Sequence, residues 1–188
     1  MRITGGQFCG RILKVPKSEA IRPTQDRVRE SVFNIIQCEI GGKCFLDLFS
    51  GSGAVGLEAL SRGASAVTFV EMNRKHLATL KENLSIVPLP LPTTTIIASD
   101  VYKWISSYIG PGFDIAFADP PYALGEEKGY ASVLKTLAER NVVKAGGMFI
   151  AEMTAVQKAE ETPGWDLLRD RTYGKTRICI WRRLSCSS

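Results

Sequence analysis

Residues 45–56, Phe-Leu-Asp-Leu-Phe-Ser-Gly-Ser-Gly-Ala-Val-Gly, carry the strongest fold signal in the chain. The first half is an apolar run typical of a buried strand. The second half is a Gly-x-Gly-x-x-Gly loop that enters a predicted helix. Glycines there allow positive φ angles and a close approach of the backbone to a ligand, and the helix N-terminus offers N–H groups to an anion. The segment therefore predicts a ligand-binding turn at the edge of an open α/β sheet.

Strand and helix signals alternate on both sides of this segment. We expect strands at Cys44–Phe49, Ala66–Glu71, Thr94–Ala98, Asp114–Ala118 and Met148–Glu152. We expect helices at Ser52–Arg62, Arg74–Ile86, Val101–Tyr108 and Tyr130–Glu139. This alternation predicts a parallel, doubly wound sheet. Residues 166–171 and 176–182, separated by Tyr-Gly-Lys, predict a closing antiparallel hairpin.

The N-terminal region shows a different pattern. Arg2–Thr4 and Arg11–Val15, placed around three glycines, are short strand candidates that predict a β-hairpin. Thr24 is expected to cap a helix that runs to about Gln37. We therefore expect an N-terminal extension over residues 1–40, a main domain over residues 41–184 and a short tail over residues 185–188.

Length and composition narrow the class of protein. A chain of 188 residues is expected to form one globular domain with a full core. No apolar run approaches membrane-spanning length and Met1–Gly6 is unlike a signal peptide, so we expect a cytoplasmic protein. Five cysteines without a Cys-x-x-Cys pair, and His76 as the single histidine, argue against a metal site. We expect free thiols, mostly buried, and a surface position for His76.

Two carboxylates flank the glycine loop. Glu71 ends the second predicted strand, 20 positions after Gly51, where a carboxylate can accept hydrogen bonds from ribose hydroxyls. Both a nicotinamide dinucleotide and S-adenosylmethionine would use it. Asp47 distinguishes between these two cofactors, because its negative charge repels the pyrophosphate of a dinucleotide but attracts the ammonium and sulfonium groups of S-adenosylmethionine.

Three further residues extend this candidate pocket. Asp100 follows the third strand and could accept from an adenine amine, while the Val101 N–H could reach a ring nitrogen. Asp100 is about equally suited to cap the helix that begins there. Met72 is placed to pack on the adenine face, and plain core packing is the alternative.

The tetrapeptide Asp119-Pro120-Pro121-Tyr122 follows an apolar run that predicts a buried strand. Consecutive prolines have fixed φ angles and no N–H donors, so the nearby carbonyls can face a ligand. A carboxylate, a carbonyl and a Tyr ring together suit a planar base with an exocyclic amine, because the acceptors take the amine hydrogens and the ring stacks. A simple proline turn is the alternative, and the flanking Asp and Tyr favour the functional interpretation.

Basic residues concentrate at the two ends of the chain. Between Arg2 and Arg29, seven basic residues stand against two acidic ones. Between Arg169 and Arg183, six stand against Asp170 alone, although the net charge of the whole chain is only +5. If the ends meet in space, they form one positive surface for a polyanion such as nucleic acid. Two separate solvated faces are the alternative.

Taken together, these motifs resemble the class I S-adenosylmethionine methyltransferases, and in particular the bacterial 16S ribosomal RNA (guanine-N2) methyltransferases that modify the small subunit. The resemblance covers nearly the whole chain. It rests on Gly10–Leu13, Arg22–Asn34, Leu46–Gly53, Asp119–Tyr122 and Tyr173–Thr176. The segment Arg-Pro-Thr-Gln-Asp-Arg-Val-Arg-Glu is the specific part, because the glycine loop is shared widely and Asp119–Tyr122 is shared with amino-methyltransferases of DNA, RNA and protein.

The resemblance implies a Rossmann-like fold with a seven-stranded, mostly parallel sheet. It implies transfer of a methyl group from S-adenosylmethionine to the N2 amine of a guanine in 16S ribosomal RNA, either naked or in an assembling small subunit, by a monomer. The implied catalytic residues are Asp119, Pro120 and Tyr122. The implied cofactor-binding residues are Asp47, Phe49, Gly51, Gly53, Glu71, Met72, Asp100 and Val101. The implied RNA contacts, with the 1–40 extension facing the RNA, are Arg11, Arg22, Arg27, Arg29 and Lys175.

Several alternatives stay open at this point. The N-terminal arginines either hold phosphate or pin the N-terminal segment, with Asp26 or Glu30 as internal partners. An adenine-N6 or glutamine-N5 methyltransferase would use a similar tetrapeptide. A nicotinamide-dependent oxidoreductase explains the loop and Glu71 but neither Asp47 nor Asp119–Tyr122. A non-catalytic RNA-binding module explains only the basic ends.

Overall fold

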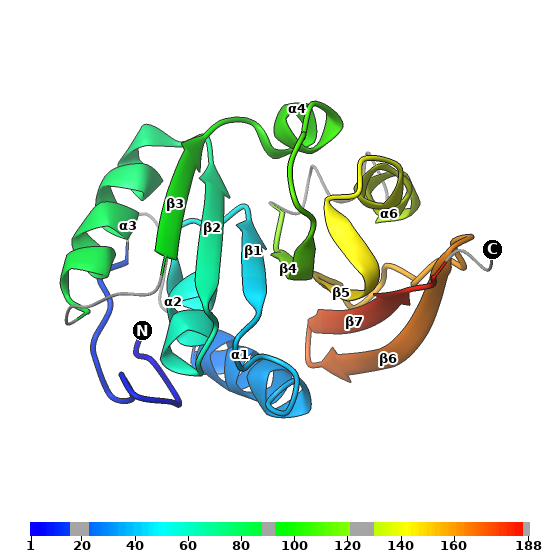
Figure 1. Ribbon diagram of the computed structural model, residues 1–188. Helices are drawn as coiled ribbons and strands as arrows, with labels where there is room; N and C mark the ends of the chain where they lie inside the picture. Colours follow the sequence, from blue (N-terminus) through cyan, green and yellow to red (C-terminus); the bar gives the residue numbers. More distant parts are fainter. Residues whose placement is uncertain (16–22, 88–92, 121–129, 186–188) are drawn as a thin grey trace. The chain divides into compact units, whose positions relative to one another are not determined.

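The computed structural model describes residues 1–15, 23–87, 93–120 and 130–185, with the side chains of residues 23–25 outside that description. The chain divides into two compact units, Met1–Ser99 and Asp100–Ser188. Figure 1 labels the helices and strands of both.

In its described residues, the first unit contains three parallel strands and three helices. Its elements are α1 (Pro23–Ile35), β1 (Cys44–Leu48), α2 (Ala54–Ser61), β2 (Ala66–Glu71), α3 (Arg74–Ser85) and β3 (Thr93–Ala98). The strands are ordered β3-β2-β1, with β2 in the middle, and lie side by side in Figure 1. Because each strand is followed by a helix or loop that returns the chain, all three end at the same edge.

The second unit contains four strands and two labelled helices. Its elements are α4 (Val101–Ser106), β4 (Phe113–Ala118), α6 (Tyr130–Glu139), β5 (Val143–Thr154), β6 (Trp165–Tyr173) and β7 (Thr176–Arg183). Strand β5 pairs parallel with β4 and antiparallel with β7, and β7 pairs antiparallel with β6. The four strands are therefore ordered β4-β5-β7-β6.

These strands make up a seven-stranded, mostly parallel sheet with antiparallel C-terminal strands, which confirms the expected fold class. Strand β2 and helix α6 have the expected bounds, and most other bounds differ by one or two residues. Strand β5 is much longer than the expected Met148–Glu152. It continues through Gly146 and Gly147, with an irregular register opposite β4. A Cβ on Gly147 would lie 2.9 Å from the Asp114 carbonyl oxygen, so glycine permits this close passage.

The expected N-terminal β-hairpin is present only as a short antiparallel pairing. Its two segments share one isolated bridge, Arg2 with Ile12, flanked by backbone hydrogen bonds from the Ile3 N–H to the Arg11 carbonyl and from the Leu13 N–H to the Met1 carbonyl, both at 3.0 Å. No longer strand forms in residues 1–15. Helix α1 begins at Pro23, one residue before the expected cap Thr24. We call residues 1–15 the N-terminal strap. Several of its backbone groups bond to side chains of α2 and α3 instead of to a partner strand.

The cysteines also depart from expectation. Of the four that the structure describes, Cys9 and Cys38 are exposed, Cys44 is half-buried and Cys179 alone is fully buried. All four are free thiols, as expected. The position of Cys38, beyond the end of α1, shows why the prediction failed: an apolar residue type does not determine burial when its backbone lies in a surface turn.

A buried carboxylate holds the N-terminal strap on the end of α2. Glu58 is 0% exposed and accepts hydrogen bonds from the Thr4 N–H at 2.8 Å and the Thr4 hydroxyl at 2.7 Å. It also pairs with Arg62 Nε at 2.8 Å and Arg29 Nε at 3.4 Å. Gly6 packs against the same turn so closely that an added Cβ would lie 1.9 Å from the Ser61 carbonyl oxygen. The strap is thus an integral part of the first unit.

Replacing Glu58 by Ala should destabilise the protein by about 3–5 kcal/mol, because the Arg29 guanidinium would stay buried without its carboxylate. Urea unfolding at neutral pH measures the change. As a control, Glu139→Ala removes a glutamate from the exposed Lys135–Glu139 pair and should leave the free energy of unfolding almost unchanged. Equal stability losses in the two variants would contradict the importance of the buried cluster.

Candidate functional site

Asp47 lies near the carboxyl end of β1 and is 1% exposed. Its Oδ2 accepts a hydrogen bond from the Gly56 N–H at 2.8 Å, which ties β1 to the first turn of α2. The pKa of Asp47 is raised from 3.8 to about 7, chiefly by burial; the Gly56 hydrogen bond opposes this rise, and the nearby charge of Glu71 adds to it. A cationic group close to Asp47 would offset this cost of burial and favour the ionised carboxylate.

Glu71 ends β2 and is 7% exposed. Its Oε2 accepts from the Gly51 N–H at 2.9 Å, and its Oε1 accepts from the Asn73 N–H at 2.7 Å. His76 approaches the same carboxylate, with Nδ1 at 3.7 Å from Oε2. Each carboxylate oxygen has two acceptor positions, so one amide bond per oxygen leaves capacity for a ligand hydroxyl.

The loop between β1 and α2 has the backbone that only glycine adopts readily. Gly51 and Gly53 have φ angles of 54° and 80°, and Phe49 shares this left-handed conformation with a φ of 58°. At Gly53 an added Cβ would lie 2.1 Å from Leu80, and at Gly56 it would lie 2.2 Å from Phe69. At Gly51, by contrast, the nearest atom would be 4.0 Å away. Gly51 therefore faces open space, while the other two glycines pack against the protein.

These features fit the cofactor that the sequence predicts. The loop exposes a glycine backbone to open space, and the two buried carboxylates provide acceptors for a cation and for hydroxyls. Met72, next to Glu71, is 63% exposed, so the alternative of core packing for this residue is wrong. An exposed thioether at the end of β2 can pack on a flat apolar ring.

Asp100 and Val101 open the second unit. Asp100 is the N-cap of α4 and accepts from the Lys103 N–H at 2.8 Å, so the capping role expected for it is confirmed. The second role in cofactor binding stays a prediction. Val101, the first residue of α4, is 3% exposed and its side chain is buried; recognition by its N–H stays a prediction.

Asp119 and Pro120 follow the last residue of β4. Asp119 is exposed and Pro120 is buried, whereas Pro121 and Tyr122 lie outside the described residues. Tyr130, at the start of α6, has a perturbed pKa: burial first, and the charge of Asp119 second, raise it. Its hydroxyl donates to the Glu152 carbonyl at 2.7 Å. The negative charge of Asp119 therefore acts on the Tyr130 hydroxyl in the same unit and favours its protonated form.

The basic residues fall into two groups. Arg11, Arg27 and Lys175 are exposed, as RNA contacts require, and Arg22 lies outside the described residues. Arg29 is only 6% exposed and binds Glu58, Asp26 and the Arg2 carbonyl. The prediction of Arg29 as an RNA contact is therefore wrong. The alternative of an internal pin holds, because the turn of α1 that bears Arg29 faces α2 and the strap.

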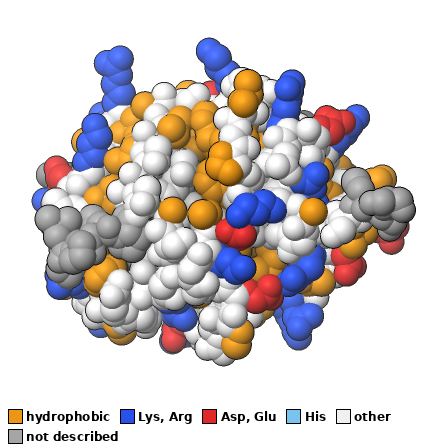
Figure 2. Space-filling view, viewed as in Figure 1, with side chains coloured by type: hydrophobic (Ala, Val, Ile, Leu, Met, Phe, Trp, Pro, Cys, Tyr) orange, Lys and Arg blue, Asp and Glu red, His pale blue; other side chains and the backbone are white. Residues whose placement is uncertain are grey.

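Charge is not gathered in one patch on the face shown in Figure 2, where basic side chains lie among acidic and apolar ones. Part of the C-terminal excess is also paired internally. Arg177 binds Asp170 through two contacts of 2.7 Å, and Arg183 binds Asn141 at 2.8 Å. The count of basic residues in the sequence thus exceeds the number available to a polyanion.

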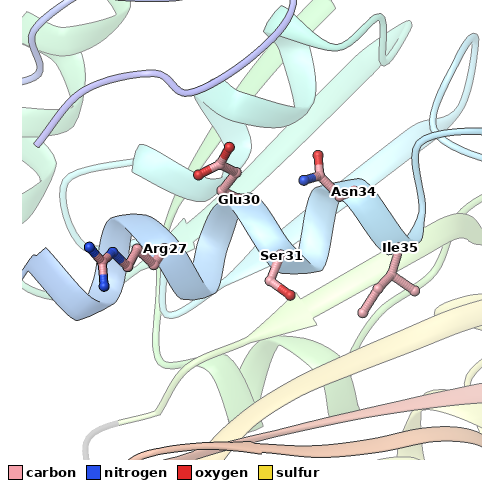
Figure 3. Close-up of a pocket in the computed structure, with 5 residues that line it drawn as sticks. All are labelled: Arg27, Glu30, Ser31, Asn34 and Ile35. Atoms are coloured by element: carbon pink, nitrogen blue, oxygen red, sulfur yellow. The ribbon is translucent and has the colours of Figure 1, made fainter.

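A surface pocket lies along α1 (Figure 3). It is lined by Arg27, Glu30, Ser31, Asn34 and Ile35. Glu30 and Asn34 rise on one side of the helix, and Ser31 and Ile35 lie on the other. The lining offers a cation, a carboxylate, an amide and a hydroxyl, which are groups that can bind the phosphate and polar edges of a nucleotide.

Sequence reasoning missed two buried polar residues beside these sites. Asn83 on α3 is 0% exposed and contacts both Ser52 of the glycine loop and Lys14 of the strap. Glu58 on α2 is the second. Their only sequence signal is a polar residue on the apolar side of a helix. In the described part of the chain, no helix could span a membrane and no group of three or more His, Cys, Asp or Glu could hold a metal.

The raised pKa of Asp47 predicts a pH-dependent stability. The folded protein holds this proton more tightly than the unfolded chain, so the free energy of unfolding should fall as pH rises from about 4 to 7. In Asp47→Asn this component should be absent, and the difference between the two proteins should reach a few kcal/mol at pH 8. Urea unfolding of both proteins at pH 5, 6, 7 and 8 measures it. Parallel pH profiles would contradict the assignment.

Comparison with known proteins places the chain in a family. The family model described as "Conserved hypothetical protein 95" matches residues 1–182. The protein named ribosomal RNA small subunit methyltransferase D is 35% identical in Haemophilus influenzae, over 93% of this chain and 89% of that one. The protein of the same name from Escherichia coli K12 is also 35% identical, over 97% and 90%. The solved structure of yhhF from Escherichia coli superposes with a TM-score of 0.85 at 30% identity, covering 98% of each chain. The chain therefore belongs to the Conserved hypothetical protein 95 family, together with these ribosomal RNA small subunit methyltransferases.

Proposed function

We propose that this protein transfers a methyl group from S-adenosylmethionine to the exocyclic N2 amine of a guanine in the ribosomal RNA of the small subunit. The observation that carries the proposal is the acidic glycine loop, in which buried Asp47 and Glu71 surround a loop that is open at Gly51. The names of the family relatives support ribosomal RNA as the substrate class. The choice of the guanine N2 amine rests on the sequence resemblance and on Asp119-Pro120.

The residues of the first unit would hold the cofactor by charge and hydrogen bonding. When bound, S-adenosylmethionine supplies an electrophilic methyl group on a positively charged sulfur. Asp47 would attract the cationic end, Glu71 would accept from the ribose hydroxyls, and Gly51 and Gly53 would let the backbone approach the ligand. Phe49 and Met72 would offer apolar contact. Asp100 and the Val101 N–H, which belong to the second unit, would bind the adenine edge.

The residues of the second unit would prepare the amine. The lone pair of guanine N2 is delocalised into the ring, so the amine is a weak nucleophile. The Asp119 carboxylate and the Pro120 carbonyl would accept its hydrogens and favour the pyramidal form that attacks. These hydrogen bonds strengthen as positive charge develops on nitrogen, so they stabilise the transition state more than the ground state. Tyr122 would stack on the base, and Asp119 or water would take the released proton.

RNA binding would use the exposed basic residues. Arg11 on the strap, Arg27 on α1 and Lys175 in the β6–β7 turn would contact phosphates, together with Arg22. The α1 pocket would receive a nucleotide of the RNA, because Arg27 in its lining offers a cation to a phosphate. The target base must leave its stack or come from a loop before it reaches Asp119. Such a base is accessible in naked ribosomal RNA or in an assembling small subunit.

Asp119→Ala should lower the turnover number about 100-fold or more while the affinity for S-adenosylmethionine stays within about threefold of the original. The reason is that Asp119 would contact the amine and not the cofactor. Glu71→Ala is the matched control and should show the reverse split, with weaker cofactor binding in calorimetry. Nucleoside mass spectrometry of the RNA product should detect N2-methylguanosine. N6-methyladenosine, or normal turnover in Asp119→Ala, would refute the proposal.

Arg27→Ala should weaken RNA binding and reduce the slope of log affinity against log salt by about one phosphate contact. Filter binding of unmodified 16S ribosomal RNA at about 50–300 mM salt measures both quantities, because phosphate contacts make the affinity strongly salt-dependent in this range. Arg140→Ala, which removes an exposed arginine outside these surfaces, serves as the control. An unchanged salt slope in Arg27→Ala would exclude this residue from phosphate contact.

A further inference from the structure

Asn83 is a fully buried polar side chain whose hydrogen bonds join two functional segments of the first unit. Its Oδ1 accepts from the Lys14 N–H at 2.8 Å, and its Nδ2 donates to the Lys14 carbonyl at 2.9 Å. The same Nδ2 donates to the Ser52 carbonyl at 2.9 Å. Both amide hydrogens are thus committed, one to the strap and one to the glycine loop.

The two hydrogen-bond partners of Asn83 lie in segments with different proposed roles. Ser52 stands between Gly51 and Gly53, in the loop that would hold the cofactor. Lys14 lies one residue before the end of the N-terminal strap, which also carries Arg11, and the chain continues from there to Arg22 and α1. Arg11 itself donates to the Ile86 carbonyl at 2.9 Å, just beyond the end of α3. One amide on α3 therefore connects the cofactor loop with the segment that bears the candidate RNA contacts.

The geometry of a planar amide makes the two contacts interdependent. A small displacement of the Ser52 carbonyl would rotate or shift the amide plane, and that motion would misalign the two bonds to Lys14. Because Asn83 is 0% exposed, no bulk water is at hand to replace a lost bond, and an unpaired buried group costs about 1–3 kcal/mol. A change of loop geometry at Ser52 would thus be transmitted to the strap.

Other strap contacts do not reach the glycine loop: Lys14 Nζ pairs with Glu82 of α3 at 2.9 Å, and a further set lies at the other end of α2. Ser61 Oγ accepts from the Phe8 N–H at 2.9 Å and donates to the Gly5 carbonyl, and Glu58 binds Thr4. None of these contacts involves a residue of the glycine loop. The Ser61 and Glu58 contacts hold the start of the strap whatever the state of the loop, whereas Asn83 connects its end with the loop itself.

We propose that Asn83 is a positioning residue that couples cofactor binding to RNA binding through the N-terminal strap. Cofactor binding in the glycine loop fixes the position of the Ser52 carbonyl. Through its hydrogen bonds, Asn83 then fixes the position of Lys14, and this determines how the strap places its cations for RNA binding. Because such coupling is reciprocal, RNA must change the cofactor affinity by the same factor by which the cofactor changes the RNA affinity. This inference rests on the proposed function and adds that the binding of one substrate changes the affinity for the other.

The test is calorimetric titration of the intact protein with S-adenosylhomocysteine, an unreactive product, with and without saturating unmodified 16S ribosomal RNA. The wild type should show a change of affinity of about fivefold or more on addition of RNA. In Asn83→Asp, an isosteric change that places an oxygen against two carbonyls, this ratio should fall below about twofold. Asn83→Ala, which removes all three hydrogen bonds without adding charge, should give the same loss of coupling if Asn83→Asp does not fold.

Ser61→Ala is the matched control, because it removes strap contacts away from the loop and should keep the wild-type ratio. A wild-type ratio near one, or equal ratios in wild type and folded Asn83 variants, would overturn the coupling and leave the proposed function standing. Failure of the wild type to bind S-adenosylhomocysteine at all would overturn both. Loss of the ratio in Ser61→Ala as well would assign the effect to general loosening of the strap and reject the specific role of Asn83.

Discussion

Two buried carboxylates fix the loop between β1 and α2, and the first unit is organised around that constraint. Asp47 and Glu71 would be unfavourable so far from water if they had no partners. The amide hydrogens of Gly56, Gly51 and Asn73 supply those partners. The same bonds hold the loop in its left-handed turns. The shape of the loop and its negative character therefore come from the same atoms, and neither can be altered separately.

The parts of the fold that depend on local pattern were predictable from the sequence. The strand–loop–helix segment, the alternation of strands and helices and the closing hairpin follow from apolar periodicity and from glycines at fixed positions. The length of strand β5 was underestimated, because two consecutive glycines, Gly146 and Gly147, considered on their own indicate the end of a strand. Their role is understandable only beside the Asp114 carbonyl, which a side chain at Gly147 would crowd.

The N-terminal strap shows where sequence reasoning fails. Its hydrogen bonds go to Glu58, Ser61 and Asn83, which are 54, 53 and 69 positions away from their partners. No local pattern reveals such distant acceptors, so the sequence predicts the antiparallel pairing within the strap but not its attachment to α2 and α3. The same limit explains Arg29. Its charge suggested a surface contact, but the sequence does not show that its helix turn faces a buried glutamate. For the candidate site, the residue types at the loop were foreseeable, whereas the buried Asn83 was not.

The close packing of glycines also constrains how this protein can vary over evolutionary time. At Gly56 the obstacle to a methyl group is the ring of Phe69 and a methyl of Val67, so a smaller residue at those positions would open the way. At Gly6 the obstacle is the main-chain oxygen of Ser61, and the φ angle is 77°. No exchange of a neighbouring side chain removes a main-chain atom. Gly56 can thus be substituted when residues of β2 change with it, whereas Gly6 cannot be substituted as long as the strap keeps its present backbone path.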